Sequence, residues 1–350
     1  MTKPISIEDR LIGAGYSAYI IAEAGVNHNG SLETALALIR SAKACGADCI
    51  KFQTFIAERV VTALAPKAAY QLKVTNPDES QFAMLKKLEL SEDHHRALVA
   101  ECRRQRIVFL STPYSIEDAE MLNSIGVPGF KIASGQLVEL PFLAAVARFN
   151  KPLILSSGMA TMDEICEAVT TIRAHGNEQL VVLQCTTNYP SLLADTNLRA
   201  MSAIAQATDT ITGYSDHTEG ITACLASVAL GAAMVEKHFT LDCTLPGPDH
   251  RCSSEPAELA ALVRGIREVE TALGDGVKQP TVAELANLTG MRRSIVAARS
   301  ILAGEKVQAV DFAFKRPATG FAPKRLSELL GRTARADIPA DTQIRPEFFV

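Results

Sequence analysis

Eight short apolar runs, each followed by a polar cluster and then by a helical pattern, constrain the fold of this chain most strongly. The runs are Tyr19–Ala24, Cys49–Phe55, Ile107–Thr112, Gly129–Ser134, Leu153–Ser157, Leu180–Cys185, Ile211–Tyr214 and Ala233–Phe239. Apolar residues recur at helical spacing between the runs, for example in Leu32–Ala44 and Met162–Ala174. Strands that alternate with helices pair in parallel, and a count of eight favours a closed barrel over an open sheet. The sequence therefore predicts an α/β fold, a (β/α)₈ TIM barrel.

The C-terminal part of the chain differs in character from the predicted barrel. A barrel takes about 250 residues, so we expect it over residues 1–275, followed by a linker over 276–290 and a small second domain over 291–350. Two segments of that domain, Ile301–Val307 and Ile338–Ile344, form a faint internal repeat of short strands and turns. The repeat predicts a compact, mostly β domain. The long segment Ala65–Leu88, after the second predicted strand, is expected to cover the barrel mouth.

The composition excludes several classes of protein. Hydrophobic residues make up 47% of the chain and charged residues 21%, which favours a large core over disorder. No apolar stretch reaches the roughly 18 residues of a membrane span, and the N-terminus lacks the apolar stretch of a signal peptide. Eight cysteines without a Cys-x-x-Cys pair indicate buried thiols in a reducing compartment. We therefore expect a cytoplasmic protein with no membrane partner.

Charge is unevenly distributed along the chain. The net charge is −4, but residues 291–350 hold 11 Lys and Arg against 6 Asp and Glu, a balance of +5 that leaves −9 for the rest. This basic part lacks the charge runs and interleaved aromatic residues of nucleic-acid-binding tails. We therefore expect a cationic lid over an anionic substrate, and no nucleic-acid partner.

Every predicted strand is followed or ended by polar side chains. The carboxyl ends of barrel strands converge on one mouth, so polar residues at these ends are candidates for catalysis and binding. They are Glu23, Asn27, His28, Lys51, Gln53, Ser111, Thr112, Lys131, Ser134, Ser156, Ser157, Thr186–Tyr189, Ser215, Asp216, His217, Glu236, Lys237 and His238.

Two lysines lie within the predicted strands, among apolar neighbours. A buried lysine is costly unless an anion compensates its charge. Lys51 and Lys131, with the serines of the neighbouring strand ends, suit a phosphate and a carboxylate bound together. Two alternatives remain open: structural ion pairs with a barrel acid such as Glu23, and a Schiff-base lysine.

Two histidines, His217 and His238, end the last two predicted strands. Two neutral imidazoles with open coordination positions suit a divalent metal that polarises a carbonyl group. Hydrogen-bonded core histidines are the alternative. His94, His95 and His175 fall in helical segments or at their ends, and we expect them at the surface.

Two further candidate site residues lie in predicted loops. Asp249 follows the Pro-Gly-Pro sequence after the last predicted strand, where its carboxylate could be held over the mouth or be a solvated turn residue. Arg316 lies between the two repeat segments and could grip an anionic ligand with its planar guanidinium. An exposed basic loop is the alternative for Arg316.

The residues named so far resemble those of a known family, the sialic acid synthases, with a C-terminal antifreeze-like (SAF) domain of the β-clip type. The segments that carry the resemblance are Ile21–Gly30, Lys51–Thr54, Leu110–Pro113, Leu155–Met159, Gly213–Thr218, Glu236–Thr240, Gly247–Asp249, Arg292–Ser294 and Lys315–Pro317. They occur in order from about residue 18 to the end of the chain. Such an enzyme joins phosphoenolpyruvate to an open-chain N-acetylated hexosamine and releases phosphate by C–O cleavage.

The resemblance also implies roles for individual residues. His217 and His238 would hold the metal, usually Mn²⁺, with Mg²⁺ or Co²⁺ as alternatives. Phosphoenolpyruvate would be bound by Lys51, Lys131, Thr112, Ser134, Ser156 and Ser215. Glu23, Gln53 and Asp249 would contact the sugar. Arg316 would reach in from the partner subunit of a domain-swapped homodimer.

Two positions depart from the family pattern. Members often carry a carboxylate where this chain has Gln136, which can contact substrate but cannot transfer a proton at neutral pH. After the sixth predicted strand the chain reads Cys-Thr-Thr-Asn-Tyr-Pro, where some members have the Asn one position earlier. The match at Tyr189 therefore predicts a substrate contact, and the choice between Thr187 and Asn188 stays open.

The exact sugar is a separate question. Several stretches resemble the N,N′-diacetyllegionaminate synthase branch more than the N-acetylneuraminate branch: Tyr70–Gln71, Glu79–Phe82, Met84–Leu90, Asn197–Met201 and Gly274–Gly276. The acceptor would then be 2,4-diacetamido-2,4,6-trideoxymannose rather than N-acetylmannosamine. Two other classes of protein remain as alternatives, a Schiff-base aldolase and a carbohydrate-binding protein without activity.

Overall fold

The computed structural model describes residues 2–68, 71–76 and 78–350, and Tyr70 of the predicted branch stretches therefore lies outside the described residues. The chain divides into two compact units, Met1–Gly274 and Asp275–Val350, which are described here one after the other. Among the described residues, no helix is both long and apolar enough to cross a membrane.

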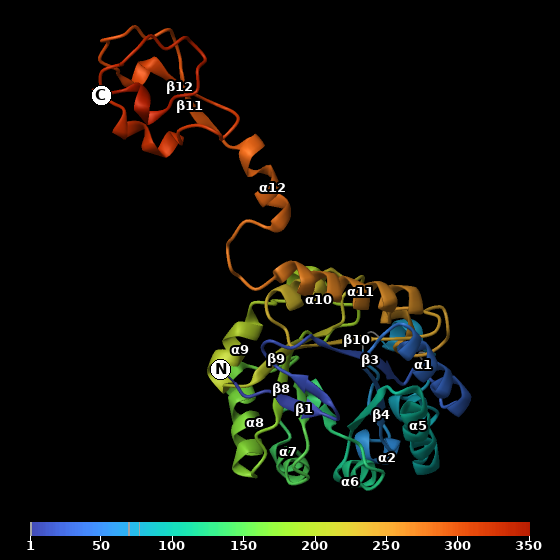
Figure 1. The fold of residues 1–350 in the computed structure, drawn as a ribbon. Helices are drawn as coiled ribbons and strands as arrows, with labels where there is room; N and C mark the ends of the chain where they lie inside the picture. The colour runs from blue at the N-terminus through green and yellow to red at the C-terminus, as the bar shows by residue number, and fades with distance from the viewer. Residues whose placement is uncertain (1, 69–70, 77) are drawn as a thin grey trace. The chain divides into compact units, whose positions relative to one another are not determined.

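The first unit is built around eight parallel strands that surround a common axis (Figure 1). In chain order they are β3 (Tyr19–Gly25), β4 (Cys49–Thr54), β5 (Val108–Pro113), β6 (Phe130–Ile132), β7 (Leu153–Ser156), β8 (Leu180–Cys185), β9 (Ile211–Asp216) and β10 (Met234–His238). Hydrogen bonds join them in the order β5-β4-β3-β10-β9-β8-β7-β6, and β5 lies next to β6. The sheet is a nearly closed barrel, so the predicted (β/α)₈ fold is confirmed.

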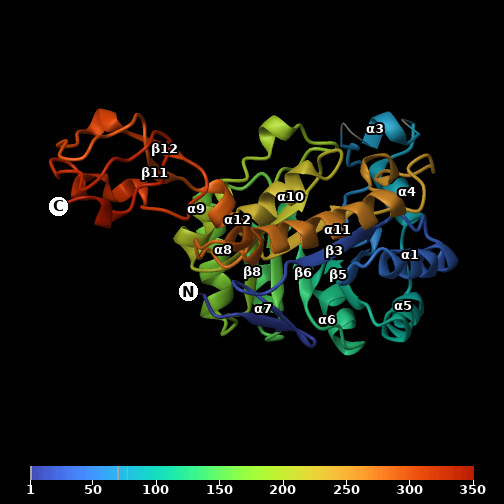
Figure 2. The ribbon, with the colours of Figure 1, turned by 45° about the horizontal axis from the view of Figure 1, so that its top comes forward.

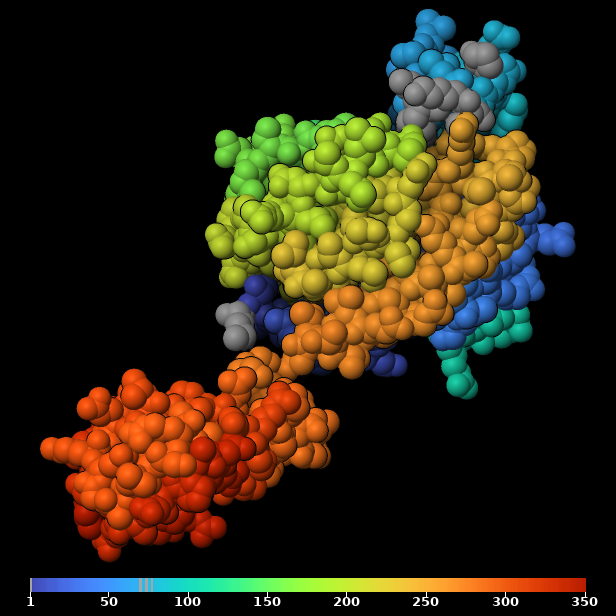
Figure 3. Space-filling model, turned by 90° about the horizontal axis from the view of Figure 1, so that it is seen from above, coloured from blue at the N-terminus to red at the C-terminus, as the bar shows by residue number. Residues whose placement is uncertain are grey.

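Eight helices surround these strands. They are α1 (Leu32–Ala44), α5 (Glu92–Gln105), α6 (Ile116–Ser124), α7 (Leu140–Ala147), α8 (Met162–Ala174), α9 (Ala200–Thr208), α10 (Thr222–Ala229) and α11 (Pro256–Leu273). Side-chain oxygens of Ser31, Ser91, Ser115 and Thr161 cap the first turns of α1, α5, α6 and α8. Helices α10 and α11 pack together, and Figure 3 shows their side chains as adjoining yellow and orange parts of one surface.

Strand alternation divides the apolar residues of the barrel into two cores. Outward-facing residues such as Ile20 and Ile50 pack under the helices, whereas inward-facing residues such as Ile21 and Cys49 fill the barrel interior. The interior is closed at the beginning of the strands by a hairpin of β1 (Ile5–Ile7) and β2 (Arg10–Ile12). This hairpin was not predicted from the sequence, because its two strands have only three residues each.

The segment between β4 and α5 lies at the opposite end of the barrel (Figure 2). It contains α2 (Ala57–Val60), α3 (Gln71–Val74) and α4 (Gln81–Lys86). Gln71, Gln81, Met84 and Leu85 line the pocket at the carboxyl ends of the strands. This agrees with the expectation that residues 65–88 cover the barrel mouth.

The second unit contains a helix that was not predicted from the sequence. We expected a linker over 276–290, but α12 (Val282–Met291) forms there behind a capping box of Thr281 and Glu284. The rest is β11 (Ser294–Ala297), β12 (Phe312–Lys315), isolated bridges and short 3₁₀ turns. Ile301 and Ile338 of the two repeat segments pair antiparallel and share one apolar core.

Two expectations about buried side chains need correction. His95, predicted at the surface, is a fully buried residue of α5, and its Nε2 lies 2.8 Å from Thr54 Oγ1 and its Nδ1 2.9 Å from the Ser91 carbonyl. All eight cysteines are free thiols, as expected, but four of them are only half-buried: Cys45, Cys166, Cys243 and Cys252.

Candidate active site

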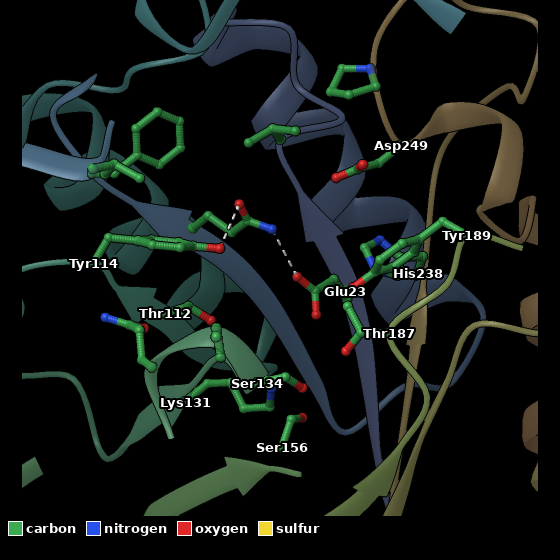
Figure 4. A pocket seen from close by; sticks show the side chains of 18 of the residues that line it. Glu23, Thr112, Tyr114, Lys131, Ser134, Ser156, Thr187, Tyr189, His238 and Asp249 are labelled. Carbon is green, nitrogen blue, oxygen red and sulfur yellow. Dashed lines mark hydrogen bonds between the residues drawn. The ribbon is translucent and has the colours of Figure 1, made fainter. Parts of the chain in front are cut away.

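A single pocket of about 400 Å³ at the carboxyl ends of the strands collects the predicted site residues of the barrel (Figure 4). Those that line it are Glu23, Lys51, Gln53, Thr112, Lys131, Ser134, Gln136, Ser156, Tyr189, Ser215, His217, His238 and Asp249. They come from all eight strands or the loops that follow them. The convergence follows from the parallel barrel, which brings strand ends that are distant in sequence to one mouth.

Four charged side chains form a lysine–glutamate cluster at the base of this pocket: Lys51, Lys131, Glu23 and Glu236. The ammonium group of Lys51 contacts the Glu23 carboxylate and lies 3.9 Å from that of Glu236. Lys131 Nζ lies 3.3 Å from Glu236 Oε1, to which Ser215 also donates a hydrogen bond of 3.1 Å. Each lysine therefore shares a carboxylate with another group.

Opposite charges within the cluster keep Glu23 and Lys51 ionised although both are buried. Burial opposes the ionisation of Glu23, but Lys51 and Lys131 hold the pKa of its carboxyl below the ordinary value. Burial likewise opposes the charged form of Lys51, but Glu23 and Glu236 raise the pKa of its ammonium group. Lys51 therefore stays protonated, which disfavours its use as a Schiff-base nucleophile, since that reaction needs the neutral amine.

Glu236 is a pocket residue that the sequence analysis placed at a strand end but did not select. It lies two positions before His238 on β10, and side chains two apart on a strand face the same side. The predicted metal ligand His238 could therefore have identified Glu236 as a pocket residue from the sequence.

The same alternation places other strand-end candidates outside the pocket. Lys237 points to the outer side of β10, where its Nζ lies 2.8 Å from Asp216 Oδ2 and 2.7 Å from the Thr218 carbonyl. Ser111 bonds to Thr54 on the outer face, at 2.6 Å. None of the residues Asn27, His28, Ser111, Ser157, Asp216 and Lys237 lines the pocket.

The two predicted metal ligands lie side by side. His217 directly follows β9 and His238 ends β10, and their ring centroids are 5.3 Å apart. His217 Nδ1 donates to the Thr186 carbonyl at 2.7 Å, which fixes the ring and leaves Nε2 as the ligand atom. The buried Nδ1 of His238 has no hydrogen-bond partner among the described residues. Burial and His217 hold the pKa of His238 well below its ordinary value, so this imidazole is neutral, as a metal ligand must be.

These features fit a divalent metal with two protein ligands. Within the described ranges, the only group of three His, Cys, Asp or Glu side chains with metal-ligand spacing is Asp242, Cys243 and Glu255, which is partly exposed and away from the pocket. A metal at His217 and His238 would therefore complete its coordination with water or substrate oxygens.

Several buried polar atoms in the pocket lack a partner within the described part of the chain. They include Ser156 Oγ, Thr187 Oγ1 and both amide atoms of Gln136. Gly158 lets the hydroxyls of Thr187 and Ser134 approach its backbone closely, because a Cβ there would lie 2.1 Å from Thr187 Oγ1 and 2.8 Å from Ser134 Oγ. Such uncommitted donors and acceptors are typical of a ligand site. Of Thr187 and Asn188, between which the sequence left the choice open, Thr187 lines the pocket and Asn188 does not. A substrate contact of Thr187 stays a prediction.

Asp249 is buried at the rim of the pocket, so its interpretation as a solvated turn residue was wrong. Its loop is anchored by Asn29, which donates to the Pro246 carbonyl at 2.9 Å, and by His250, whose Nδ1 lies 2.7 Å from Thr240 Oγ1. Burial and the nearby Glu23 raise the pKa of Asp249 to about 7. Its carboxyl group therefore changes charge near neutral pH.

Tyr114 is a second pocket residue that the sequence analysis missed. Its hydroxyl donates to Gln53 Oε1 at 3.4 Å, and Gln53 Nε2 donates to Glu23 Oε1 at 3.3 Å (Figure 4). Tyr189, which was predicted, packs its ring against His217 with centroids 4.2 Å apart.

Arg316 belongs to the second unit and is not among the pocket residues. Its side chain is exposed, and its Nε donates to the Met291 carbonyl at 3.0 Å. Its predicted role in a partner's site stays a prediction.

Comparison with known proteins agrees with this geometry. The NeuB family model matches residues 38–278, and the SAF domain model matches residues 292–350. The N,N′-diacetyllegionaminic acid synthase of Campylobacter jejuni subsp. jejuni is 45% identical over 328 residues, which are 93% of this chain and 98% of that protein. The protein of the same name from Legionella pneumophila is 41% identical over 336 residues, covering 95% and 94% of the two chains.

Among solved structures, N-acetylneuraminic acid synthetase from Leptospira borgpetersenii, in complex with citrate, aligns with a TM-score of 0.73 and 32% identity. The alignment covers 82% of this chain and 95% of that chain. This chain therefore belongs to the NeuB family and carries a C-terminal SAF domain.

Proposed function

We propose that this chain condenses phosphoenolpyruvate with 2,4-diacetamido-2,4,6-trideoxymannose and water to give N,N′-diacetyllegionaminate and phosphate. It is a phosphoenolpyruvate-dependent condensing enzyme of its family, and the names of the two relatives reported above support the legionaminate branch. N-acetylmannosamine, with N-acetylneuraminate as product, is the alternative substrate. The observation that carries the proposal is the arrangement of His217 and His238 beside the lysine–glutamate cluster in one pocket.

Phosphoenolpyruvate binds, in this proposal, at the cluster and at the hydroxyls beside it. Lys51 and Lys131 are the cations, and the hydroxyls are those of Thr112, Ser134, Ser156 and Ser215. Two lysines opposite two glutamates leave little net positive charge for a multiply charged anion. The anion would therefore take over lysine contacts that the glutamates make in its absence.

A divalent metal held by His217 and His238 would polarise the sugar aldehyde as a Lewis acid. We propose Mn²⁺, with Mg²⁺ or Co²⁺ as alternatives. The free Nε2 of His217 and the unpartnered Nδ1 of His238 support the assignment of these two ligands.

The reaction then needs two bond-forming steps. C3 of the enol attacks the aldehyde carbon, which forms the new C–C bond and leaves positive charge at C2. Water adds at C2 and loses a proton, and the tetrahedral intermediate expels phosphate by C–O cleavage. Lys51 and Lys131 stabilise the charge on the phosphate group during these steps, because they already contact it once phosphoenolpyruvate is bound.

The sugar chain lies, in this proposal, against Glu23, Gln53 and Asp249, with Tyr189 beside the histidines. Glu23 is ionised in this pocket and can therefore accept but not donate a proton. Gln136 can contact substrate but cannot take part in proton transfer. Glu23, substrate phosphate or water would then act as the base.

We also propose that Arg316 of the partner subunit completes the site in a domain-swapped homodimer. The net positive charge of residues 291–350 supports this role, because the substrate that it would cover is anionic. The raised pKa of Lys51 disfavours a Schiff base on that lysine.

The proposal is tested by measuring phosphate release from phosphoenolpyruvate with each sugar, with and without metal. We expect release only when phosphoenolpyruvate, sugar and metal are all present, and faster release with the diacetamido sugar. Release that needs no sugar, or a pyruvyl adduct trapped by borohydride on Lys51 or Lys131, would contradict it.

A further inference from the structure

The side of the pocket formed by the segment between β4 and α5 differs from the rest. We call it the α2–α4 wall: Phe55, Val60, Gln71, Gln81, Met84 and Leu85. Among the described residues of 55–88, no Lys, Arg, Asp or Glu lines the pocket. The wall therefore offers apolar surface and two amide groups, whereas the opposite side offers hydroxyls, lysines and histidines.

The apolar part of the wall is fixed by packing. Val60 and Leu85 pack against a buried cluster that contains Phe55, and the Phe55 ring meets the Tyr114 ring edge-on at 5.9 Å between centroids. Tyr114 in turn is linked through Gln53 to Glu23 (Figure 4). The wall thus has a defined position relative to the lysine–glutamate cluster.

One amide of the wall has an unused acceptor. Gln81 Nε2 donates to Gln71 Oε1 at 3.4 Å, and Gln71 Oε1 also accepts from the Ala68 N–H at 3.0 Å. Gln81 Oε1 has no hydrogen-bond partner within the described ranges, and this side chain lines the pocket. A ligand with an N–H group would satisfy it.

We propose that the α2–α4 wall is the site that selects an acetamido group at C4 of the sugar. The inference rests on the proposed function, which puts the aldehyde C1 at the histidines and so directs the far end of the sugar chain away from them. An acetamido group carries both an N–H donor for Gln81 Oε1 and a methyl group for Val60, Met84 and Leu85. A hydroxyl at C4 would leave the apolar side chains without a partner.

Three sugars separate the contributions of C4 and C6. N-acetylmannosamine and 2,4-diacetamido-2,4-dideoxymannose differ only at C4, and the latter differs from 2,4-diacetamido-2,4,6-trideoxymannose only at C6. Pairs of sugars compete in one reaction, so the ratio of kcat/KM values does not depend on how much enzyme is folded. We expect the C4 step to raise kcat/KM by about tenfold or more, and the C6 step to have the smaller effect.

Two variants test the wall itself. Gln81→Met keeps the length of the side chain but removes the amide, and we expect it to lower the C4 ratio by about fivefold, the value of one hydrogen bond. Val60→Thr replaces one methyl group by a hydroxyl and should lower the ratio as well. Gln206→Met is the matched control, because this exposed glutamine on α9 lies outside the pocket. Its ratio should equal that of the unmodified enzyme.

The outcomes distinguish this inference from the proposed function. A C4 ratio that neither Gln81→Met nor Val60→Thr changes would overturn the inference alone. Turnover of all three sugars with no preference at C4 would overturn the inference together with the choice of the diacetamido sugar, but not the condensation itself. Absence of turnover with every sugar would overturn the proposed function and, with it, this inference.

Discussion

Buried lysines lie on both faces of the barrel wall, and they differ in how completely their charges are paired. Lys237, on the outer side of β10, has a close carboxylate partner in Asp216 and a second acceptor in the Thr218 carbonyl. Lys51 and Lys131, on the inner side, share Glu23 and Glu236 and face a pocket with uncommitted hydroxyls. A lysine with fully matched partners stabilises the fold, whereas lysines with shared partners beside open space are available to a ligand.

Substitution of an inner lysine should have the largest effect on the reaction. Lys131→Met removes one cation from the proposed phosphoenolpyruvate site, and we expect kcat/KM to fall by about 10³-fold, as for the loss of one preorganised charge-stabilising group. Denaturant unfolding should change far less, since Glu236 keeps Lys51 and Ser215 as neighbours. A variant with undiminished phosphate release would remove Lys131 from the mechanism.

The outer lysine should show the reverse behaviour. Lys237→Met leaves the buried Asp216 carboxylate without its cation, and we expect a loss of about 3–5 kcal/mol in the free energy of unfolding. The folded fraction should keep its KM for phosphoenolpyruvate, because Lys237 does not line the pocket. Equal stability of this variant and the unmodified chain would show that the comparison between the two groups is wrong.

A neutral buried contact on the same outer side should have a smaller effect. His95 joins Thr54 to the backbone of α5, and His95→Ala should cost about 2 kcal/mol of unfolding free energy, from lost packing and an unpaired hydroxyl. His175→Ala is the matched control, because His175 is exposed on α8's C-terminal side and should change stability by less than about 0.5 kcal/mol. Equal effects of the two substitutions would argue against a structural role for His95.

The pH dependence of sugar binding should show the smallest effect. Burial and Glu23 raise the pKa of Asp249 to about 7, so its carboxyl group is neutral below that pH and anionic above it. The anion accepts hydrogen bonds from sugar hydroxyls more strongly, so KM for the sugar should fall severalfold as pH rises through about 7 at saturating metal. Asp249→Asn should abolish this dependence. A dependence that persists unchanged in the variant would assign it to another group.

The fold could be predicted from the sequence because its signals are local and repeated. Two helices, Leu32–Ala44 and Met162–Ala174, begin and end where the apolar spacing places them. The β1–β2 hairpin and α12 were not foreseen, since three-residue strands carry too little pattern and the proline before α12 favoured a linker. His95 was misassigned although its spacing to Leu98, Val99 and Cys102, all buried, is that of one helical face.

The site could be predicted as a set of residues but not as a set of contacts. The strand ends predicted which side chains gather at the pocket. The inward position of Glu236 and the outward position of Lys237, however, depend on where the strand begins, and the apolar runs fix that point only within a residue or two. Tyr114 follows β5 and was missed because nothing in its neighbours indicates that its hydroxyl meets Gln53.

The proposed reaction depends most on the metal site, and metal binding tests that site without any need for turnover. Isothermal titration with Mn²⁺ should show one ion bound per chain of the metal-stripped protein, and His217→Ala and His238→Ala should each weaken that binding by at least about tenfold, because each removes one of only two protein ligands. Binding of equal affinity and stoichiometry in the unmodified protein and in both variants would contradict the account.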